Sequence, residues 1–146
     1  MAEHPLSALV GHRLPGGRYS LAPHENFLLH DALYSTPTPR PHPLAAFVAA
    51  QRGMGVSVAE LFRLFESDID DGPLLVECGL EFHRELTEAT EYEVGGVIDA
   101  VERRTSRRIG DFDRITCRFT LTDPASGQVA ATVTNVFAIP RREAPA

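Results

Sequence analysis

The spacing of apolar and polar residues changes near the middle of the chain. In the first half apolar residues recur at helical spacing, and from about residue 74 they alternate with polar residues. The clearest alternation places Ile115, Cys117, Phe119 and Leu121 between polar neighbours, which predicts a strand with one buried face. The order of elements therefore predicts an α+β fold, with helices first and a largely antiparallel sheet afterwards.

Three further strands are predicted from the same alternation. They cover residues 74–83, residues 92–100 and a final segment from about 128 to 139. The five residues 123–127, Asp-Pro-Ala-Ser-Gly, are typical of a hairpin turn before the last strand. His83 falls on the same face of its strand as two glutamates, so we expect it to face solvent or an interface rather than the core.

The first half predicts two helices and a stiff loop. Residues 35–43 contain four prolines, so neither a helix nor a strand ladder can pass through them. Residues 44–52 form an alanine-rich helix that ends at Gly53 and is apolar nearly all round, which predicts that protein surrounds it. A second helix begins at a capping box made by Ser57 and Glu60 and carries one apolar stripe. Residues 24–34 could form a further short helix.

The apolar helix and the sheet can bury each other if the sheet curves around the helix. This is the hotdog fold, an antiparallel sheet wrapped around a central apolar helix, and we expect it to form one domain over residues 1–146. Such a sheet leaves an edge strand open, so we expect a dimer, either with a second copy or with a related chain.

Composition and charge exclude several classes of function. The formal net charge is −6, which argues against nucleic-acid binding. All 14 basic residues are arginine, so Schiff-base and other lysine chemistry is excluded. The histidines lack the spacing of a metal site, and no nucleotide-binding or serine-hydrolase motif is present, so we expect no metal and no cofactor. With no secretion signal and no membrane-spanning apolar run, we expect a cytoplasmic protein.

The two cysteines, Cys78 and Cys117, both lie in apolar strand segments. This position predicts buried, reduced thiols. A disulfide or a reactive nucleophile would need an oxidising compartment or an activating neighbour, and the sequence indicates neither.

Three segments of the chain resemble a known family: residues 42–55, residues 80–86 together with 92–94, and residues 132–141. The first resembles the central helix, the second the strands that follow the helices, and the third the terminal strand of MaoC-like dehydratases, and more closely of their N-terminal, FAS1-like half. The resemblance spans nearly the whole chain. It implies dehydration of an (R)-3-hydroxyacyl thioester, or hydration of an enoyl thioester, carried on CoA or on acyl carrier protein.

Active members of that family carry an Asp-x-Asn-Pro-x-His pattern before the central helix. The chemistry needs two titrating groups that face one pair of carbons. Here Asp31 and His42 are the candidate catalytic residues, but they stand on either side of the proline segment and not at the spacing of the pattern. Adjacent residues point in different directions, so His30 and Asp31 are not a catalytic pair. This departure favours a subunit that works beside a second hotdog chain carrying the complete pair.

Two groups of residues are candidates for binding the substrate. The end of the central helix could line an acyl tunnel, and an arginine cluster could bind the phosphates of CoA or an acidic carrier protein, or could simply be a solvated loop between strands. The first group is Gln51, Arg52, Gly53, Met54 and Gly55, and the second is Arg103, Arg104, Arg107 and Arg108.

Two other functions fit the same fold. A non-catalytic hotdog module could bind an acyl or polyketide thioester and stabilise an enzyme dimer. A hotdog acyl-CoA thioesterase would need a general base on or near the central helix, and Glu60 on the following helix is poorly placed for that role.

Overall fold

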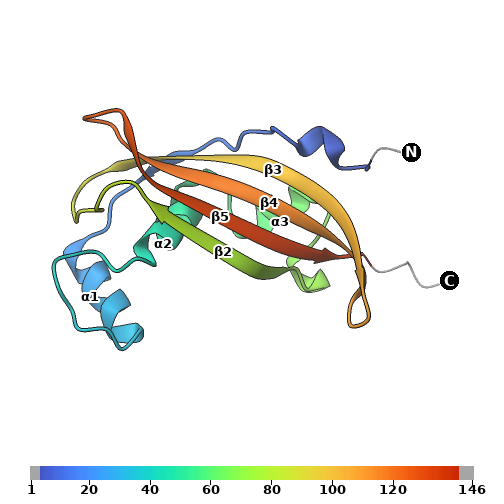
Figure 1. The fold of residues 1–146 in the computed structure, drawn as a ribbon, viewed down its shortest axis with the longest axis horizontal. Helices are drawn as coiled ribbons and strands as arrows, with labels where there is room; N and C mark the ends of the chain where they lie inside the picture. The colour runs from blue at the N-terminus through green and yellow to red at the C-terminus, as the bar shows by residue number, and fades with distance from the viewer. Residues whose placement is uncertain (1–3, 142–146) are drawn as a thin grey trace.

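The sheet has five antiparallel strands in the order β1–β3–β4–β5–β2 (Figure 1). The computed structural model describes residues 4–141. The four predicted strands are confirmed, and a short first strand is added at one edge. The strands are β1 (Gly17–Tyr19), β2 (Leu74–Phe82), β3 (Tyr92–Ser106), β4 (Gly110–Asp123) and β5 (Gln128–Pro140).

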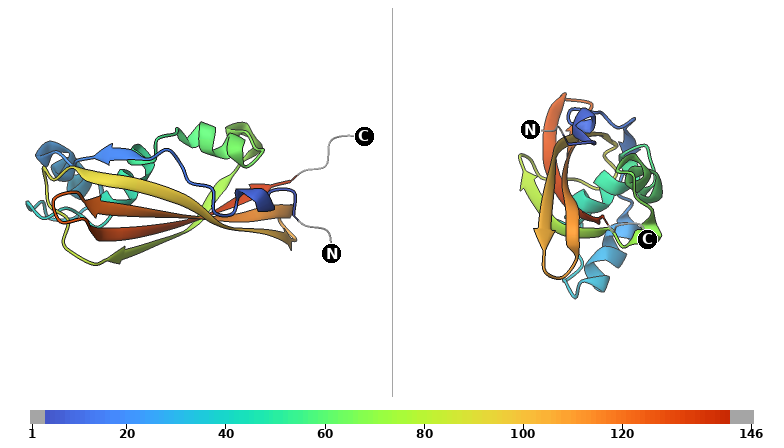
Figure 2. Two further views of the ribbon diagram at one scale, coloured as in Figure 1. Left: turned by 90° about the horizontal axis from the view of Figure 1, so that it is seen from above. Right: turned by 90° about the vertical axis from the view of Figure 1, so that its right-hand side faces the viewer.

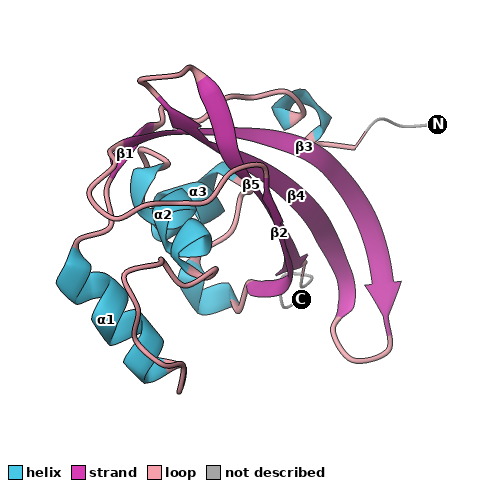
Figure 3. Ribbon diagram, turned by 60° about the vertical axis from the view of Figure 1, so that its left-hand side comes forward, coloured by secondary structure: helices cyan, strands magenta, loops and turns pink. Residues whose placement is uncertain are grey.

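Three helices precede or interrupt the strands. They are α1 (Pro23–Ala32), α2 (Ala45–Gly53) and α3 (Val58–Leu64), and two short 3₁₀ turns lie at Ser7–Leu9 and Ile69–Asp71. The curved sheet holds α2 and α3 on its concave side, whereas α1 lies beyond one end of the sheet (Figures 2 and 3). The chain therefore has the predicted α+β hotdog fold. Within residues 4–141 no helix is long and apolar enough to cross a membrane.

The predicted starts of the elements follow from local chemistry. The capping box is confirmed, because Ser57 Oγ accepts a hydrogen bond from the Glu60 amide at 3.1 Å and Glu60 Oε1 accepts one from the Ser57 amide at 3.1 Å. The hairpin turn between β4 and β5 is also confirmed, and Gly127 adopts a φ of 70° there, which favours glycine. The capping box fixes where α3 begins, and the hairpin turn fixes how β5 returns along β4.

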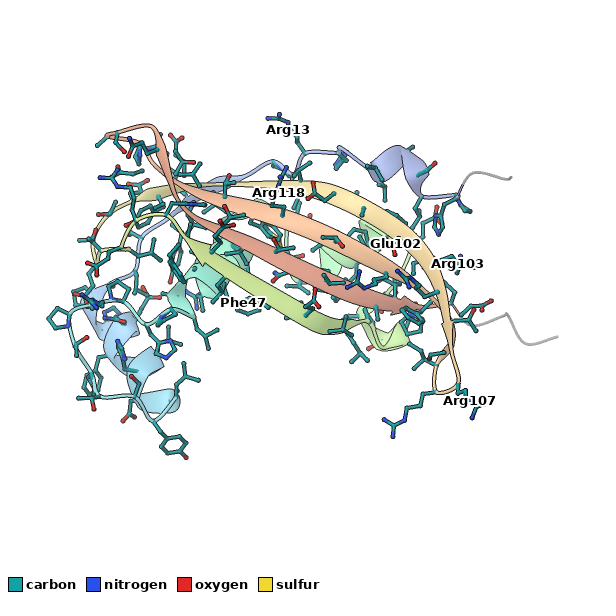
Figure 4. The ribbon with its side chains drawn as sticks, viewed as in Figure 1. Arg13, Phe47, Glu102, Arg103, Arg107 and Arg118 are labelled. Atoms are coloured by element: carbon teal, nitrogen blue, oxygen red, sulfur yellow. The ribbon has the colours of Figure 1, made fainter. Side chains whose placement is uncertain are left out.

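Small side chains let α2 approach the sheet closely. Its buried residues are four alanines and Gly53, and a Cβ atom at Gly53 would lie 2.4 Å from Cγ2 of Val94 on β3. Gly53 is therefore needed for close packing of helix and strand, not for a special backbone angle. The prediction that protein surrounds the helix is wrong on one side, where Phe47 and Val48 are only half-buried. Figure 4 places Phe47 near the edge of the sheet that β2 forms.

Two irregularities in the strand pairing change which residues share a face. The register shifts between Leu75 and Glu77 in β2, so the predicted alternation from Leu74 is wrong at its start, and Leu75 shares the concave face with Cys78. A second shift follows Ile98 in β3. Each extra residue in one strand moves the side chains beyond it to the other face.

The edge strand β2 is exposed along most of its length. Leu74, Leu75 and Val76 are 41–53% exposed, and Phe82 at the other end is 43% exposed. The burial prediction is confirmed for Cys117 but wrong for Cys78, which is exposed, because α2 packs mainly against β1, β3, β4 and β5 and β2 is the strand at the edge of the sheet. A strand of apolar residues with one free edge is suited to pairing with another strand.

A buried carboxylate joins the two ends of the described chain. Asp113 on β4 is 1% exposed and accepts hydrogen bonds at 2.7 Å from the side chains of His4, Arg103 and Arg141. Arg141 also donates to the backbone carbonyls of Phe65 and Glu66 after α3. The N-terminal segment, the β3–β4 hairpin and the end of β5 therefore meet at one point, at the end of the sheet where both termini lie (Figures 1 and 2).

Candidate functional site

The first helix buries polar side chains and exposes apolar ones. Asn26 and His30, four residues apart on one face of α1, are 0% and 6% exposed, whereas Phe27 and Leu28 are 52% and 59% exposed. This is the reverse of an ordinary surface helix. The buried polar face points at the proline-rich loop, so α1 is held to the protein by hydrogen bonds.

Asn26 fixes the path of the proline-rich loop. Its Nδ2 donates to the carbonyls of Thr38 at 3.0 Å and Arg40 at 3.3 Å, and to Glu88 Oε1 at 2.7 Å. Its Oδ1 accepts from the His42 backbone amide at 3.1 Å. Because the prolines of this loop have no N–H, the loop cannot be held by a regular backbone ladder. Side-chain hydrogen bonds to its carbonyl groups hold it instead.

Two histidines meet beside this asparagine. The rings of His30 and His42 are 5.2 Å apart, nearly perpendicular. Both nitrogens of His30 are occupied, one with Ser35 Oγ and one with the Arg40 carbonyl, each at 2.9 Å. Since a carbonyl only accepts, His30 Nε2 carries the proton and donates. We call Asn26, His30, Ser35, His42 and Glu88 the histidine cluster.

The hydrogen bonding of His42 determines which nitrogen it can offer to a ligand. Its Nδ1 accepts from the Leu44 backbone amide at 3.0 Å. The neutral ring therefore carries its proton on Nε2 and presents a donor there. Burial, and to a smaller extent the neighbouring His30, lower the pKa of His42 below its ordinary value. His42 is therefore neutral at pH 7 and suited to donating a hydrogen bond to a carbonyl oxygen.

The structure separates the two residues predicted to be catalytic. Asp31 is exposed on α1, one position beyond the buried His30. Among the described residues no hydrogen bond or ion pair joins Asp31 to His42; the ring that faces His42 is His30. Glu88, the carboxylate of the cluster, is hydrogen-bonded to Asn26, and no carboxylate among the described residues is hydrogen-bonded to His42, so His42 supplies half of an acid–base pair.

A pocket of about 370 Å³ opens beside the histidine cluster. One wall comes from the proline-rich loop and the other from the end of β2 and the residues after it. His42 lies between two of the lining prolines in sequence but is not itself a lining residue. The lining residues are Arg40, Pro41, Pro43, Phe82, His83, Arg84, Glu85 and Leu86. His83 is exposed, as predicted.

The segment proposed for the acyl tunnel divides into three environments. Gly53 and Met54 are packed in the core, and Arg52 is exposed and pairs with Glu25 at 3.3 Å. Gly55 is exposed, with a φ of 86°. Gln51 is half-buried and lies one turn after Phe47 and Val48, on the side of α2 that the protein leaves open.

The arginine cluster does not lie in a single loop. Arg103 and Arg104 are within β3, where they bind Asp113 at 2.7 Å and Glu102 at 2.6 Å. The prediction of a loop is therefore wrong for these two, because β3 and β4 continue as a long hairpin. Arg107 and Arg108 occupy its turn. Figure 4 shows Arg103 and Arg107 at the opposite end of the molecule from α1.

The convex face of the sheet has a second depression, of about 890 Å³. Arg13 and Arg118 lie along it (Figure 4). Arg118 pairs with Asp99 at 3.5 Å, and threonines of β4 and β5 line the floor. Nowhere in residues 4–141 do three or more histidine, cysteine or acidic side chains come together as a metal site would require.

Three buried polar residues were not predicted from the sequence: Asn26, Asp113 and Asn135. Each could have been found by extending a periodic pattern. Asn26 precedes His30 by one helical turn, and Asp113 continues the alternation of the buried residues of β4. Asn135 likewise falls between buried Val133 and Phe137 on β5.

Comparison with solved structures supports the fold. The chain is similar to a subunit of the C-terminally truncated HadBC (3R-hydroxyacyl-ACP dehydratase) complex of Mycobacterium tuberculosis, with a TM-score of 0.66 at 12% identity over 89% of this chain and 96% of that one. It is similar to the ChsH1–ChsH2 complex of the same organism, with a TM-score of 0.61 at 12% identity over 96% and 90%. It is also similar to the (R)-hydratase of A. caviae involved in PHA biosynthesis, with a TM-score of 0.51 at 14% identity over 90% and 96%.

At such low sequence identity, the structural similarity establishes the hotdog fold but not the reaction. No protein-family model matches the chain, and no curated protein matches its sequence. The structures it is similar to include MaoC-like dehydratases and hydratases, and two of the three come from complexes of two different chains.

Proposed function

We propose that this chain is the thioester-binding subunit of an (R)-3-hydroxyacyl-thioester dehydratase or enoyl-thioester hydratase, and that a second hotdog chain supplies the complete acid–base pair. The observation that carries this proposal is the histidine cluster: His42 lies before the central helix, as in the family that the sequence resembles, but Asp31 does not face it. Dehydration needs a base to remove the proton next to the thioester carbonyl and an acid to protonate the departing hydroxyl, which leaves as water.

In this proposal His42 binds and orients the thioester. Its Nε2–H can donate to the thioester oxygen, while Nδ1 stays bonded to the Leu44 amide. His30 cannot replace the missing carboxylate, since both of its ring nitrogens are already hydrogen-bonded. The pocket between the proline-rich loop and the end of β2 gives an acyl thioester access to this region.

The proposal is tested by three measurements on the purified chain: hydration of crotonyl-CoA, release of free CoA thiol, and binding of butyryl-CoA. We expect binding without hydration and without thiol release. His42→Ala should weaken binding about tenfold, the effect of losing one hydrogen bond to a polar ligand. His24→Ala, which alters an exposed histidine on α1, is the matched control and should bind as the original chain does.

Each other outcome has a defined meaning. Hydration by the chain alone that is lost in Asp31→Asn and His42→Ala would contradict partner dependence. Thiol release would favour the thioesterase. Failure to bind any acyl-CoA would contradict the proposed function as a whole.

We further propose that the partner pairs along the edge of β2. Its N–H and C=O groups on that side are free of β-ladder bonds within the described chain, and Val76 is 53% exposed. The structures of paired chains named above support an assembly of two hotdog subunits. An acyl-CoA or an acyl carrier protein thioester would then bind where the two chains meet.

We expect the purified chain to self-associate through the same edge when its partner is absent. Light scattering should give about twice the chain mass of 16.0 kDa for the original protein and the mass of one chain for Val76→Arg, since a charge on an edge strand blocks strand pairing. The control is Ile69→Arg, at a position that is 56% exposed outside the strands. Equal masses for all three proteins would contradict pairing through β2.

A further inference from the structure

Asn135 is a polar side chain in the middle of an apolar surface. It lies on β5, is 1% exposed, and its Oδ1 has no hydrogen-bond partner among the described residues. Its neighbours on the same face of β5 are Val133 and Phe137, which are also buried. Rotating the amide by 180° would place the nitrogen there, equally without a partner. Because buried polar groups almost always have a partner, the missing one should come from outside the chain.

Asn135 lies at the boundary between the buried core and the exposed edge strand β2. Strand pairing places Ile98, Cys117, Asn135 and Cys78 in one row across β3, β4, β5 and β2. The first three are buried and Cys78 is exposed. The carboxamide therefore lies on the concave face, between the buried Cys117 of β4 and the exposed Cys78 of the edge strand β2.

The distance from the pocket to Asn135 suits an acyl chain. Phe82, which lines the pocket, pairs with Ala131, and Asn135 is four residues further along β5. At about 3.3 Å per strand residue this is about 13 Å. Between them the concave face presents Leu80 and Val133. A ligand whose thioester is near His42 would therefore cross an apolar stretch before it meets a polar group.

We propose that Asn135 selects acyl groups that carry a hydroxyl group remote from the thioester. This proposal rests on the proposed function and narrows its substrate class. An unsubstituted fatty acyl chain would leave the carboxamide without a partner, whereas a hydroxyl group can donate to Oδ1 in a surrounding where water is largely excluded. A site that has a buried polar group discriminates against ligands that leave it unpaired.

The test compares the affinities of the purified chain for decanoyl-CoA and for a series of hydroxydecanoyl-CoA isomers hydroxylated at successive carbons away from the thioester. Titration calorimetry should show one remote isomer binding about five- to tenfold more tightly than decanoyl-CoA. Asn135→Leu should abolish that preference while decanoyl-CoA binds at least as well as before. Its melting temperature should rise, because an unpaired polar group is removed from an apolar row. Asn135→Val is the smaller replacement should leucine be too large for the row.

Thr134→Val is the matched control, because Thr134 is the adjacent polar residue of β5 and faces the opposite side of the sheet, toward Gly79. It should keep the preference. Equal affinity of the original chain for every thioester would overturn the role of Asn135 and leave the proposed function standing, as expected if a partner subunit covers this surface. A preference that survives in both Asn135 variants would also overturn it. Failure of all the thioesters to bind would overturn both proposals.

Discussion

Asp113→Asn is expected to lower the free energy of unfolding by about 3 kcal/mol at pH 7. The carboxylate is buried and accepts hydrogen bonds from His4, Arg103 and Arg141, so the substitution leaves two guanidinium groups without their counter-charge. Removing one partner of a buried ion pair typically costs about 3–5 kcal/mol. We expect the lower end of that range because Arg103 is partly exposed and can be hydrated.

The same carboxylate predicts how stability depends on pH. Burial on its own would raise the pKa of Asp113, but the hydrogen bonds from Arg103, Arg141 and His4 outweigh it and hold that pKa below its ordinary value. A pKa that is lower in the folded chain than in the unfolded one stabilises the fold above the unfolded value, about 3.9. That contribution should be fully present at pH 5–7 and should be lost as the pH falls through the folded pKa.

Urea unfolding at a series of pH values measures both effects. The difference in unfolding free energy between the original chain and Asp113→Asn should be constant from pH 5 to pH 7 and should shrink in more acidic solution. Asp111→Asn is the control, since Asp111 is an exposed carboxylate two residues away that accepts from Thr105 Oγ1 at 2.7 Å. If Asp111→Asn destabilised the chain as much as Asp113→Asn, the network around Asp113 would not be what holds the ends together.

The second large effect is expected for Asn26→Leu, a replacement of nearly equal volume. It removes the donor to the Thr38 carbonyl and to Glu88 Oε1 and the acceptor of the His42 amide, whereas the Arg40 carbonyl keeps its hydrogen bond from His30. Each buried group left without a partner costs about 1–3 kcal/mol, and the Thr38 carbonyl can turn to water. We therefore expect a loss of about 2–3 kcal/mol of stability together with loss of the proposed thioester binding, since the loop that holds His42 is released.

Leu28→Gln provides the control for Asn26→Leu. Leu28 is 59% exposed on the opposite face of α1, so this change should leave stability within about 0.5 kcal/mol. Melting temperatures and acyl-CoA titrations on both variants would separate the two roles of Asn26. Retained thioester affinity in a destabilised Asn26→Leu chain would show that the proline-rich loop does not position the binding site.

Much of the fold could be predicted from residue spacing, because burial on one face of a strand or helix imposes a period. Residues 115–121 alternate strictly, and the four apolar residues of that alternation in β4 are all buried. The capping box at Ser57 is a local motif, so its outcome depends on few other residues. The position of a β-bulge could not be predicted from residue spacing. No feature of the sequence around Val76 indicates that the pairing register with β5 shifts there.

The candidate site was harder to predict because it depends on contacts between distant segments. His42 was recognised as a candidate, but its neighbour proved to be His30 and not Asp31, which is settled by how α1 is rotated. That rotation follows from Asn26, whose partners lie 12, 14, 16 and 62 residues away in sequence. The prediction that Cys78 is buried was wrong for a similar reason. The sequence alone does not indicate which strand lies at the exposed edge of the sheet.

The bare edge of β2 has a consequence for how cells must make this protein. A newly made chain exposes a row of apolar residues beside backbone groups that lack ladder bonds, and any other extended segment can pair with it. In the proposed assembly of two hotdog chains, an excess of this chain would therefore pair with itself or with other extended segments through β2. If the partner is a second hotdog chain, as proposed, synthesis of both chains from one messenger RNA would shorten the time that this edge stays unpaired.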